Sequence, residues 1–263
     1  MKTMPPEKRI MIKLKSKAQI SIMKEAGRIT GEALIIAMEA IREGVTTKHL
    51  DDLIRHHIEK CGAKPTFLGY GGFPASACIS LNDQVIHGIP SSKTVLKEGD
   101  VVKIDVGATY KGYVGDSANT FGVGRISPEA QALIDGTKAS FYAGAAAFAE
   151  GNRLGDIGSA VQTCAEGRGF GVIREYVGHG VGTEMHESPE VPNYGTPGRG
   201  VRLARGMVIA IEPMITAGGY RVKTLGDGWT VVTVDGSLAA HYEHTCALTE
   251  NGVEFLTRVD ETL

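Results

Sequence analysis

Apolar residues recur at helical spacing in the first quarter of the chain. One stretch covers residues 16–44 and a second covers residues 47–62, each closed by a glycine. Ser16 with Gln19 three residues later resembles a capping box, and Thr47 is a residue type that caps helix starts. The pattern therefore predicts two helices, one after the other.

A second pair of helical stretches follows in the middle of the chain. Ser127, Pro128 and Glu129 stand in the order of cap, proline and acid that begins helices, and an apolar stripe continues to Gly151. Another stripe predicts a helix over residues 154–167. Between and after the helix pairs lie β-rich stretches interrupted by glycines. The order is helix pair, strands, helix pair, strands.

This order suggests a repeat, and two segments support it. Residues 99–105 align without gaps on residues 206–212. Both contain a glycine, then an apolar strand, then a carboxylate, Asp105 in the first copy and Glu212 in the second. Coincidence in a common strand pattern is the alternative, but a helix pair precedes each copy. We expect a duplicated α/β unit whose halves each place an acid at a shared seam.

The strand that carries Asp105 is predicted to form a hairpin with the next strand. Strands over residues 101–107 and 112–121 are separated by a tight turn placed near Tyr110 and Lys111. With a two-residue turn there, Asp105 faces Asp116, with Cβ atoms about 4.5–5.5 Å apart. Like charges that close raise one pKa unless a cation compensates, so the pair indicates a metal.

Glu212 and Glu243 extend this acidic pair to four residues. Two divalent cations would neutralise four carboxylates, which favours a two-metal site over a one-metal site. Such a site can hold a shared water as hydroxide near neutral pH. Carboxylates with imidazole suit Mn, Fe, Co or Zn.

Three histidines stand in or beside glycine-bearing turns before these strands, His87, His179 and His186. Each alone could equally be structural or solvated. The segment around His179 lacks the GxGxxG spacing of a dinucleotide loop, and the chain contains neither a phosphate-binding GxxxxGK[ST] nor a GxSxG nucleophile elbow. Metal-assisted chemistry is favoured over covalent catalysis.

Composition excludes several classes of protein. The chain has 263 residues, 42% hydrophobic and 22% charged, with a formal charge of -2. It lacks the basic excess of a DNA-binding protein and the apolar run of about 20 residues that a membrane span needs. Basic residues concentrate in residues 1–16, where we expect a flexible arm. The absence of a signal peptide and four widely spaced cysteines predict a cytoplasmic protein.

Six motifs together resemble those of the type I methionine aminopeptidases. They are residues 82–90 (NDQVIHGIP), 103–107 (KIDVG), 115–116 (GD), 178–182 (GHGVG), 211–214 (IEPM) and 242–245 (YEHT). The resemblance implies the pita-bread fold for residues 17–263: an α/β (α+β) domain of two pseudo-symmetric halves, with a curved antiparallel sheet around a dinuclear metal site.

The resemblance also implies roles for individual residues. It implies two divalent metal ions (Co, Mn, Fe or Zn) with five protein ligands: Asp105, Asp116, His179, Glu212 and Glu243. His87 and His186 would contact the substrate, and Glu212 would act as general base. The methionine pocket would be formed by aromatic and sulfur-containing residues, namely Phe67, Tyr70, Phe73, Cys78, Met185 and Trp229. Many family members have Phe in place of Met185 and Cys in place of Phe67, which leaves the pocket width open.

The implied activity is removal of the initiator methionine from nascent polypeptides whose second residue is small. The N-terminal arm could touch the ribosome transiently, although a solvated tail is the simpler interpretation, and a monomer is expected. A proline-directed (Xaa-Pro) peptidase of the same fold is the nearest alternative. A non-catalytic binding protein of this fold is the other, and the complete ligand set argues against it.

Overall fold

The computed structural model describes residues 11–259, and the first two helices form as the sequence predicts. Helix α1 spans Lys17–Ala40, and Ser16 with Gln19 forms the predicted capping box. Helix α2 spans Thr47–Lys60, but its N-cap is Thr46 and not Thr47. The Thr47 hydroxyl instead accepts a hydrogen bond from the Ser91 backbone at 2.9 Å. Two adjacent threonines thus divide capping and loop anchoring between them.

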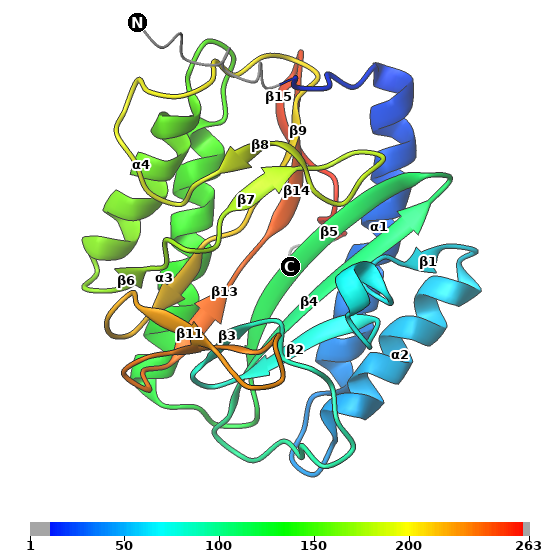
Figure 1. Cartoon of the computed structure of the whole chain (residues 1–263), viewed down its shortest axis with the longest axis vertical. Helices are drawn as coiled ribbons and strands as arrows, with labels where there is room; N and C mark the ends of the chain where they lie inside the picture. Colours follow the sequence, from blue (N-terminus) through cyan, green and yellow to red (C-terminus); the bar gives the residue numbers. More distant parts are fainter. Residues whose placement is uncertain (1–10, 260–263) are drawn as a thin grey trace, which may run out of the picture.

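The second helix pair also confirms the pattern. Helix α3 spans Pro128–Ala147, and the Ser127 side chain accepts from the Ala130 N–H at its start. Helix α4 spans Leu154–Glu166 and ends at Gly167. In Figure 1, α1 and α2 flank the strands on one side and α3 and α4 flank them on the other. The two halves of the predicted repeat are therefore visible as helix pairs around a central layer of strands.

Within residues 11–259 the strands form four antiparallel sheets. One contains β1 (Lys64–Pro65), β2 (Ala77–Leu81), β4 (Val101–Tyr110) and β5 (Tyr113–Gly122). The five-stranded sheet contains β7 (Gly178–Gly180), β8 (Glu187–Val191), β9 (Val208–Ile211), β14 (His244–Thr249) and β15 (Gly252–Phe255). Each of the two remaining sheets has three strands. One contains β6 (Gly171–Val172), β10 (Met214–Thr216) and β13 (Ala239–His241). The other contains β3 (Gln84–Ile86), β11 (Val222–Thr224) and β12 (Val231–Thr233). A 3-10 turn, η1, covers Tyr70–Gly72.

The predicted register of the β4–β5 hairpin is wrong by one residue on each side of the turn. The two turn residues are Lys111 and Gly112, both with positive φ, and not Tyr110 and Lys111. A two-residue hairpin turn of this kind needs left-handed backbone at both positions, which glycine adopts freely. Asp105 therefore pairs with Ala118, and Asp116 pairs with Gly107. The two acids are diagonal neighbours on the same face and not direct partners.

The two halves are joined by hydrogen bonds between β5 and the segment around β13 and β14. The Glu243 N–H donates to the Ala118 carbonyl at 2.8 Å, and the Thr245 hydroxyl donates to the Asp116 carbonyl at 2.8 Å. The Thr120 hydroxyl donates to the His241 carbonyl at 2.7 Å. This seam fixes the backbone of Asp116 and Glu243 relative to each other, so that acids from different halves lie together.

Helix α1 lies close both to β5 of its own half and to Leu256, directly after β15, in the second half. A Cβ atom on Gly27 would lie 2.1 Å from the Leu256 carbonyl oxygen, and one on Gly115 would lie 2.7 Å from the Gly27 Cα. Both positions therefore require glycine for close approach of backbone to backbone.

Gly27→Ala is expected to destabilise the fold by about 1–3 kcal/mol, because the added methyl group meets backbone that cannot rotate away. Chemical denaturation at equilibrium measures this. Gly226→Ala is the matched control, since a Cβ there meets nothing within 4 Å. Equal stability of the two variants would show that the backbone around Gly27 can accommodate a methyl group.

The described end of the predicted N-terminal arm lies against the domain. The Lys15 side chain is buried and its Nζ donates to Glu187 Oε2 at 2.7 Å. Glu187 also accepts from the Thr183 N–H at 3.0 Å, so this contact anchors the loop that carries Met185 and His186. The expected flexibility therefore does not extend to Lys15, and residues 1–10 lie outside the described residues. No helix in residues 11–259 has the length and apolar character needed to cross a membrane.

Candidate active site

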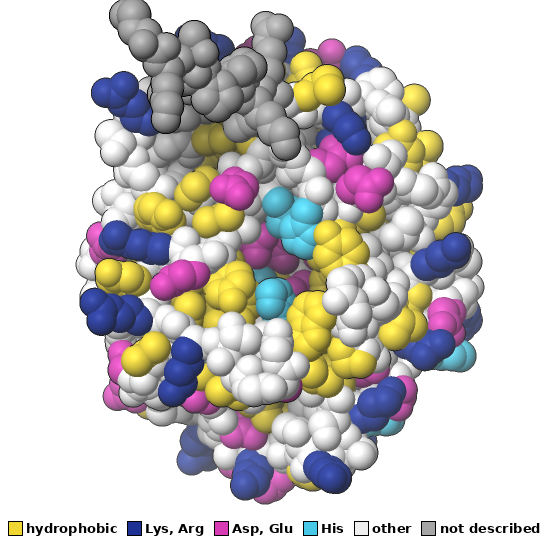
Figure 2. Space-filling model, in the orientation of Figure 1, with side chains coloured by type: hydrophobic (Ala, Val, Ile, Leu, Met, Phe, Trp, Pro, Cys, Tyr) yellow, Lys and Arg dark blue, Asp and Glu magenta, His cyan; other side chains and the backbone are white. Residues whose placement is uncertain are grey.

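A cleft of about 760 Å³, including its open mouth, lies between the two halves. Figure 2 shows histidine and acidic side chains at the bottom of this hollow and hydrophobic side chains around it. Every residue that the sequence predicted for the site lines the cleft: Phe67, Tyr70, Phe73, Cys78, His87, Asp105, Asp116, His179, Met185, His186, Glu212, Trp229 and Glu243. The fold therefore gathers residues that are up to 176 positions apart in the chain.

The acids converge from four chain segments. Asp105 lies on β4, Asp116 on β5, Glu212 directly after β9 and Glu243 directly before β14. Asp116 and Glu243 are each only 2% exposed. Three buried carboxylate oxygens have no hydrogen-bond partner, one each on Asp105, Asp116 and Glu243. Buried polar atoms are rarely left unpaired, so these oxygens fit a cation as their partner.

The surroundings disfavour the charged forms of these acids when no cation is bound. Burial raises the pKa of Asp105 well above its usual value, and the Asp116 and Glu212 charges add to this effect. Burial likewise raises the pKa of Glu243, with further contributions from Asp116 and Glu212. A divalent cation among the oxygens would reverse this balance, because it favours the ionised carboxylates.

His179 on β7 directs one ring nitrogen at the acids. Its Nδ1 lies 3.0 Å from the Gly180 carbonyl, which accepts from it. Its Nε2 then lies 3.5 Å from Asp116 Oδ2 and 3.4 Å from Glu212 Oε1. Burial opposes a charge on this ring, but the neighbouring carboxylates outweigh burial and raise its pKa to about 9. A fixed imidazole beside carboxylates is a common metal-ligand arrangement.

Ligand atoms of two overlapping residue groups lie close enough to hold a cation. Asp116, His179 and Glu243 form one group, and Glu212, His241 and Glu243 form the other, with ligand atoms within 4.8 Å of one another. Glu243 belongs to both groups. The oxygen and imidazole donors suit a divalent cation, and a carboxylate common to both groups suits a pair of them.

His241 is the residue that sequence reasoning missed. Its Nε2 lies 3.6 Å from Glu212 Oε2 and 3.9 Å from Glu243 Oε2, and neither ring nitrogen has a hydrogen-bond partner. The available signal was its position two residues before Glu243, because residues two apart in extended chain share a face. Tyr176, which also lines the cleft, carried no comparable signal.

His87 and His186 lie on the walls of the cleft. His87 has a positive φ of 59°, and burial lowers its pKa to about 4. The His186 ring lies 4.2 Å from the His179 ring, and its Nδ1 is 2.8 Å from the Tyr70 hydroxyl. Burial lowers the pKa of His186 too. Both rings are thus held in the neutral form, in which one nitrogen donates and the other accepts.

The remaining wall is apolar. Phe67, Phe73 and Cys78 are buried, and Met185 and Trp229 pack against them. The rings of Phe73 and Trp229 meet edge to face at 5.1 Å. Burial raises the pKa of Cys78 well above its usual value, so it remains a thiol and contributes as a small apolar side chain.

Comparisons with known proteins agree with this geometry. The model of metallopeptidase family M24 matches residues 21–250. The methionine aminopeptidase of Clostridium acetobutylicum is 56% identical over 247 residues, which are 94% of this chain and 99% of that protein. Methionine aminopeptidase 1 of Bacillus subtilis is 50% identical and covers 95% of this chain and all of its own length.

Solved structures of two kinds of enzyme resemble this chain to different degrees. The methionine aminopeptidase of Thermotoga maritima superposes with a TM-score of 0.93 at 46% identity, covering 94% of this chain and 100% of its own. The prolidase of Pyrococcus furiosus reaches a TM-score of 0.75 at 24% identity over 66% of its own length, which shows a common fold alone. The chain therefore belongs to metallopeptidase family M24 and, within that family, to the type I methionine aminopeptidases.

Proposed function

We propose that this enzyme removes the initiator methionine from nascent polypeptides whose second residue is small. One observation carries the proposal: an apolar wall of aromatic and sulfur-containing side chains and a buried cluster of acids share one cleft. The wall suits the unbranched, polarisable methionine side chain. The acids lie where the peptide bond after that methionine would reach them.

Two divalent cations, chosen among Mn, Fe, Co and Zn, are proposed for the acid cluster. Their ligands would be five residues, Asp105, Asp116, His179, Glu212 and Glu243, with His241 adjacent. When bound, the cations would supply Lewis-acid charge that polarises the scissile carbonyl and activates the attacking water. The unpaired oxygens of three of these acids support this assignment.

Glu212 is the proposed general base. Its oxygens lie 3.4 Å from His179 Nε2 and 3.6 Å from His241 Nε2, within the cleft. It would accept a proton from the attacking water and deliver that proton to the leaving amine as the C–N bond breaks. The products are then free methionine and the shortened peptide with a new amino terminus.

The neutral histidines would position the substrate. An N–H of His87 would donate a hydrogen bond to the leaving amide group, and His186 would act on the carbonyl side. His186 is oriented by its contact with the Tyr70 hydroxyl. Hydrogen-bond donors of this kind stabilise the transition state most, because negative charge develops there on the atoms that accept their hydrogen bonds.

Cleavage of two peptides tests the proposed specificity. Metal-loaded enzyme is expected to release methionine from Met-Ala-Ser and to leave Ala-Pro intact, as measured by chromatography of the products. Preferred cleavage of Ala-Pro would instead support the proline-directed alternative.

Metal binding is expected to release protons, because Asp105 and Glu243 hold raised pKa values and His179 has a pKa of about 9 in the metal-free site. A ligand group that must lose a proton makes the metal affinity depend on pH. Below the pKa of that group, the affinity falls about tenfold for each unit by which the pH is lowered. Calorimetric titration with Mn²⁺ in buffers of different ionisation enthalpy measures the number released. Binding without proton release, and with constant affinity from pH 6 to pH 8, would contradict the assignment.

Three further statements stay predictions from the sequence. They are a cytoplasmic location, a monomeric state and transient contact between the basic arm and the ribosome. The arm's lysines support the last of these by charge alone.

A further inference from the structure

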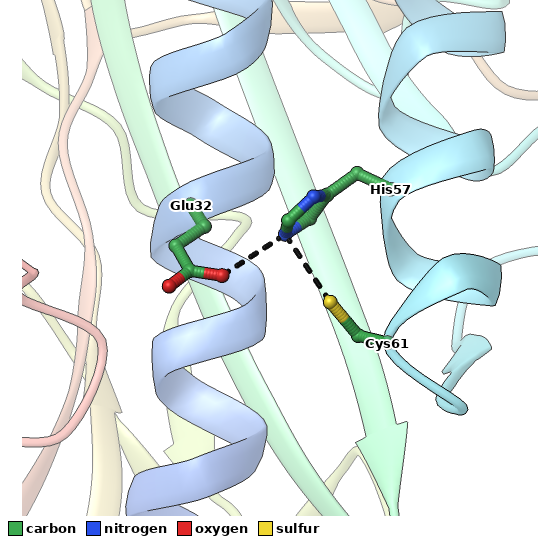
Figure 3. Close-up of side chains that lie close together, drawn as sticks. All are labelled: Glu32, His57 and Cys61. Carbon is green, nitrogen blue, oxygen red and sulfur yellow. Dashed lines mark hydrogen bonds and ion pairs between the residues drawn. The ribbon is translucent and has the colours of Figure 1, made fainter.

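A second group of metal-ligating side chains lies outside the cleft, between helices α1 and α2. It consists of Glu32 on α1, His57 on α2 and Cys61 at the end of α2 (Figure 3). None of the three lines the active-site cleft. The proposed reaction leaves this group without a role. We infer that Glu32, His57 and Cys61 form a second, separate site for a divalent cation of the Zn²⁺ type.

The three donor atoms lie within 4.8 Å of one another. His57 Nε2 lies 3.1 Å from Glu32 Oε2 and 3.6 Å from Cys61 Sγ. Zn²⁺ bonds of about 2.0–2.1 Å to nitrogen, 2.0–2.2 Å to oxygen and 2.3 Å to sulfur, at tetrahedral angles, place these pairs about 3.4 Å and about 3.6 Å apart. The second distance already matches, and the first requires a shift of a few tenths of an ångström.

The helices hold this arrangement in place. The Cys61 N–H donates to the His57 carbonyl at 3.0 Å, so the two side chains lie one helical turn apart on the same face of α2. Arg28 binds the other oxygen of Glu32, Oε1, and leaves Oε2 directed at His57. One Nε2–H can point at only one of its two neighbours, whereas a cation would contact all three atoms.

Charge and exposure also fit. Cys61 would lose its thiol proton to solvent on binding, and a thiolate with a carboxylate neutralises one divalent cation. The His57 side chain is 17% exposed and that of Glu32 is 28% exposed, so water can occupy a fourth position. Nitrogen, oxygen and thiolate donors together favour Zn²⁺ over Mg²⁺ or Mn²⁺. A bound ion would join α1 to α2 and stabilise the first half of the molecule.

Titration with Co²⁺ tests this site separately from the cleft, because coordination by thiolate gives a near-ultraviolet charge-transfer band. We expect wild-type protein to show that band and Cys61→Ser to lose it. His57→Ala should raise the Co²⁺ concentration needed for half-saturation by about tenfold or more. Cys164→Ser, which changes a comparable half-buried cysteine near the end of α4, should keep the band.

Two further measurements guard against misfolding and against the cleft as the source of the signal. Cys61→Ser should cleave Met-Ala-Ser at the wild-type rate, and Zn²⁺ should raise the melting temperature of wild-type protein more than that of Cys61→Ser. Absence of the band in wild-type protein, or its persistence in Cys61→Ser, would overturn the inference. Equal thermal shifts in the two proteins would do the same.

Discussion

Asp116→Asn is expected to lose bound metal and peptidase activity together. Asp116 is 2% exposed, one of its oxygens has no partner, and it lies 3.5 Å from His179. The amide has nearly the same shape as the carboxylate but carries no charge, so it removes attraction for cations while preserving packing. Loss of several kcal/mol of Lewis-acid stabilisation corresponds to a fall in kcat/KM of roughly 10³-fold.

Metal content after extensive dialysis and the rate on Met-Ala-Ser measure the two losses. The control is Asp135→Asn, which makes the same change at an exposed position on α3, and it should retain both properties. Circular dichroism should show unchanged secondary structure in both variants. Asp116→Asn with full activity and no metal would refute the proposed ligand role.

His87→Ala is expected to separate metal binding from catalysis. The ring lies on the wall of the cleft, and burial lowers its pKa to about 4, so it is a neutral donor at neutral pH. Removing one such donor costs about 2.7–4 kcal/mol in the transition state, which is roughly 10²–10³-fold in kcat. The metal content should stay at the wild-type level.

Steady-state kinetics on Met-Ala-Ser and elemental analysis of the same preparation provide the comparison. His49→Ala, at an exposed position on α2, controls for the loss of a histidine as such. A normal kcat in His87→Ala would remove this residue from the mechanism. Loss of metal in His87→Ala would show that it acts as a ligand instead.

Local signals in the sequence predict much of this molecule. The caps at Ser16 and Ser127 begin helices because a side-chain oxygen satisfies a backbone N–H that has no partner in the helix. The repeat predicts a strand before each of Asp105 and Glu212, and both strands are present, although β4 continues past Asp105 to Tyr110 whereas β9 ends directly before Glu212. Such features depend on neighbours in sequence, which are visible without a structure.

Features that depend on backbone geometry were harder to predict. The turn at Lys111 and Gly112 shifts the hairpin, and a shift of two in the sum of partner numbers moves Asp116 from opposite Asp105 to opposite Gly107. The acids stay on one face, because the side-chain period of a strand is two. The prediction that Asp105 and Asp116 lie close together therefore holds although the predicted register was wrong.

Contacts between segments far apart in the chain were the hardest to predict from the sequence. The position of His241 two residues before Glu243 places both on one face of the chain, but its approach to Glu212 depends on how β13 and β9 pack beside the cleft. Glu32 likewise meets His57 and Cys61 only through the packing of α1 on α2. Tertiary packing, and not local pattern, creates both arrangements.

In the proposed metal site, acids from both halves surround cations in one cleft. Anomalous scattering from Mn²⁺ in crystals of the enzyme tests it most directly. We expect anomalous peaks in contact with Asp105 and Asp116 from the first half and with Glu212 and Glu243 from the second. Peaks bound by one half alone, or no peak in the cleft at saturating Mn²⁺, would contradict it.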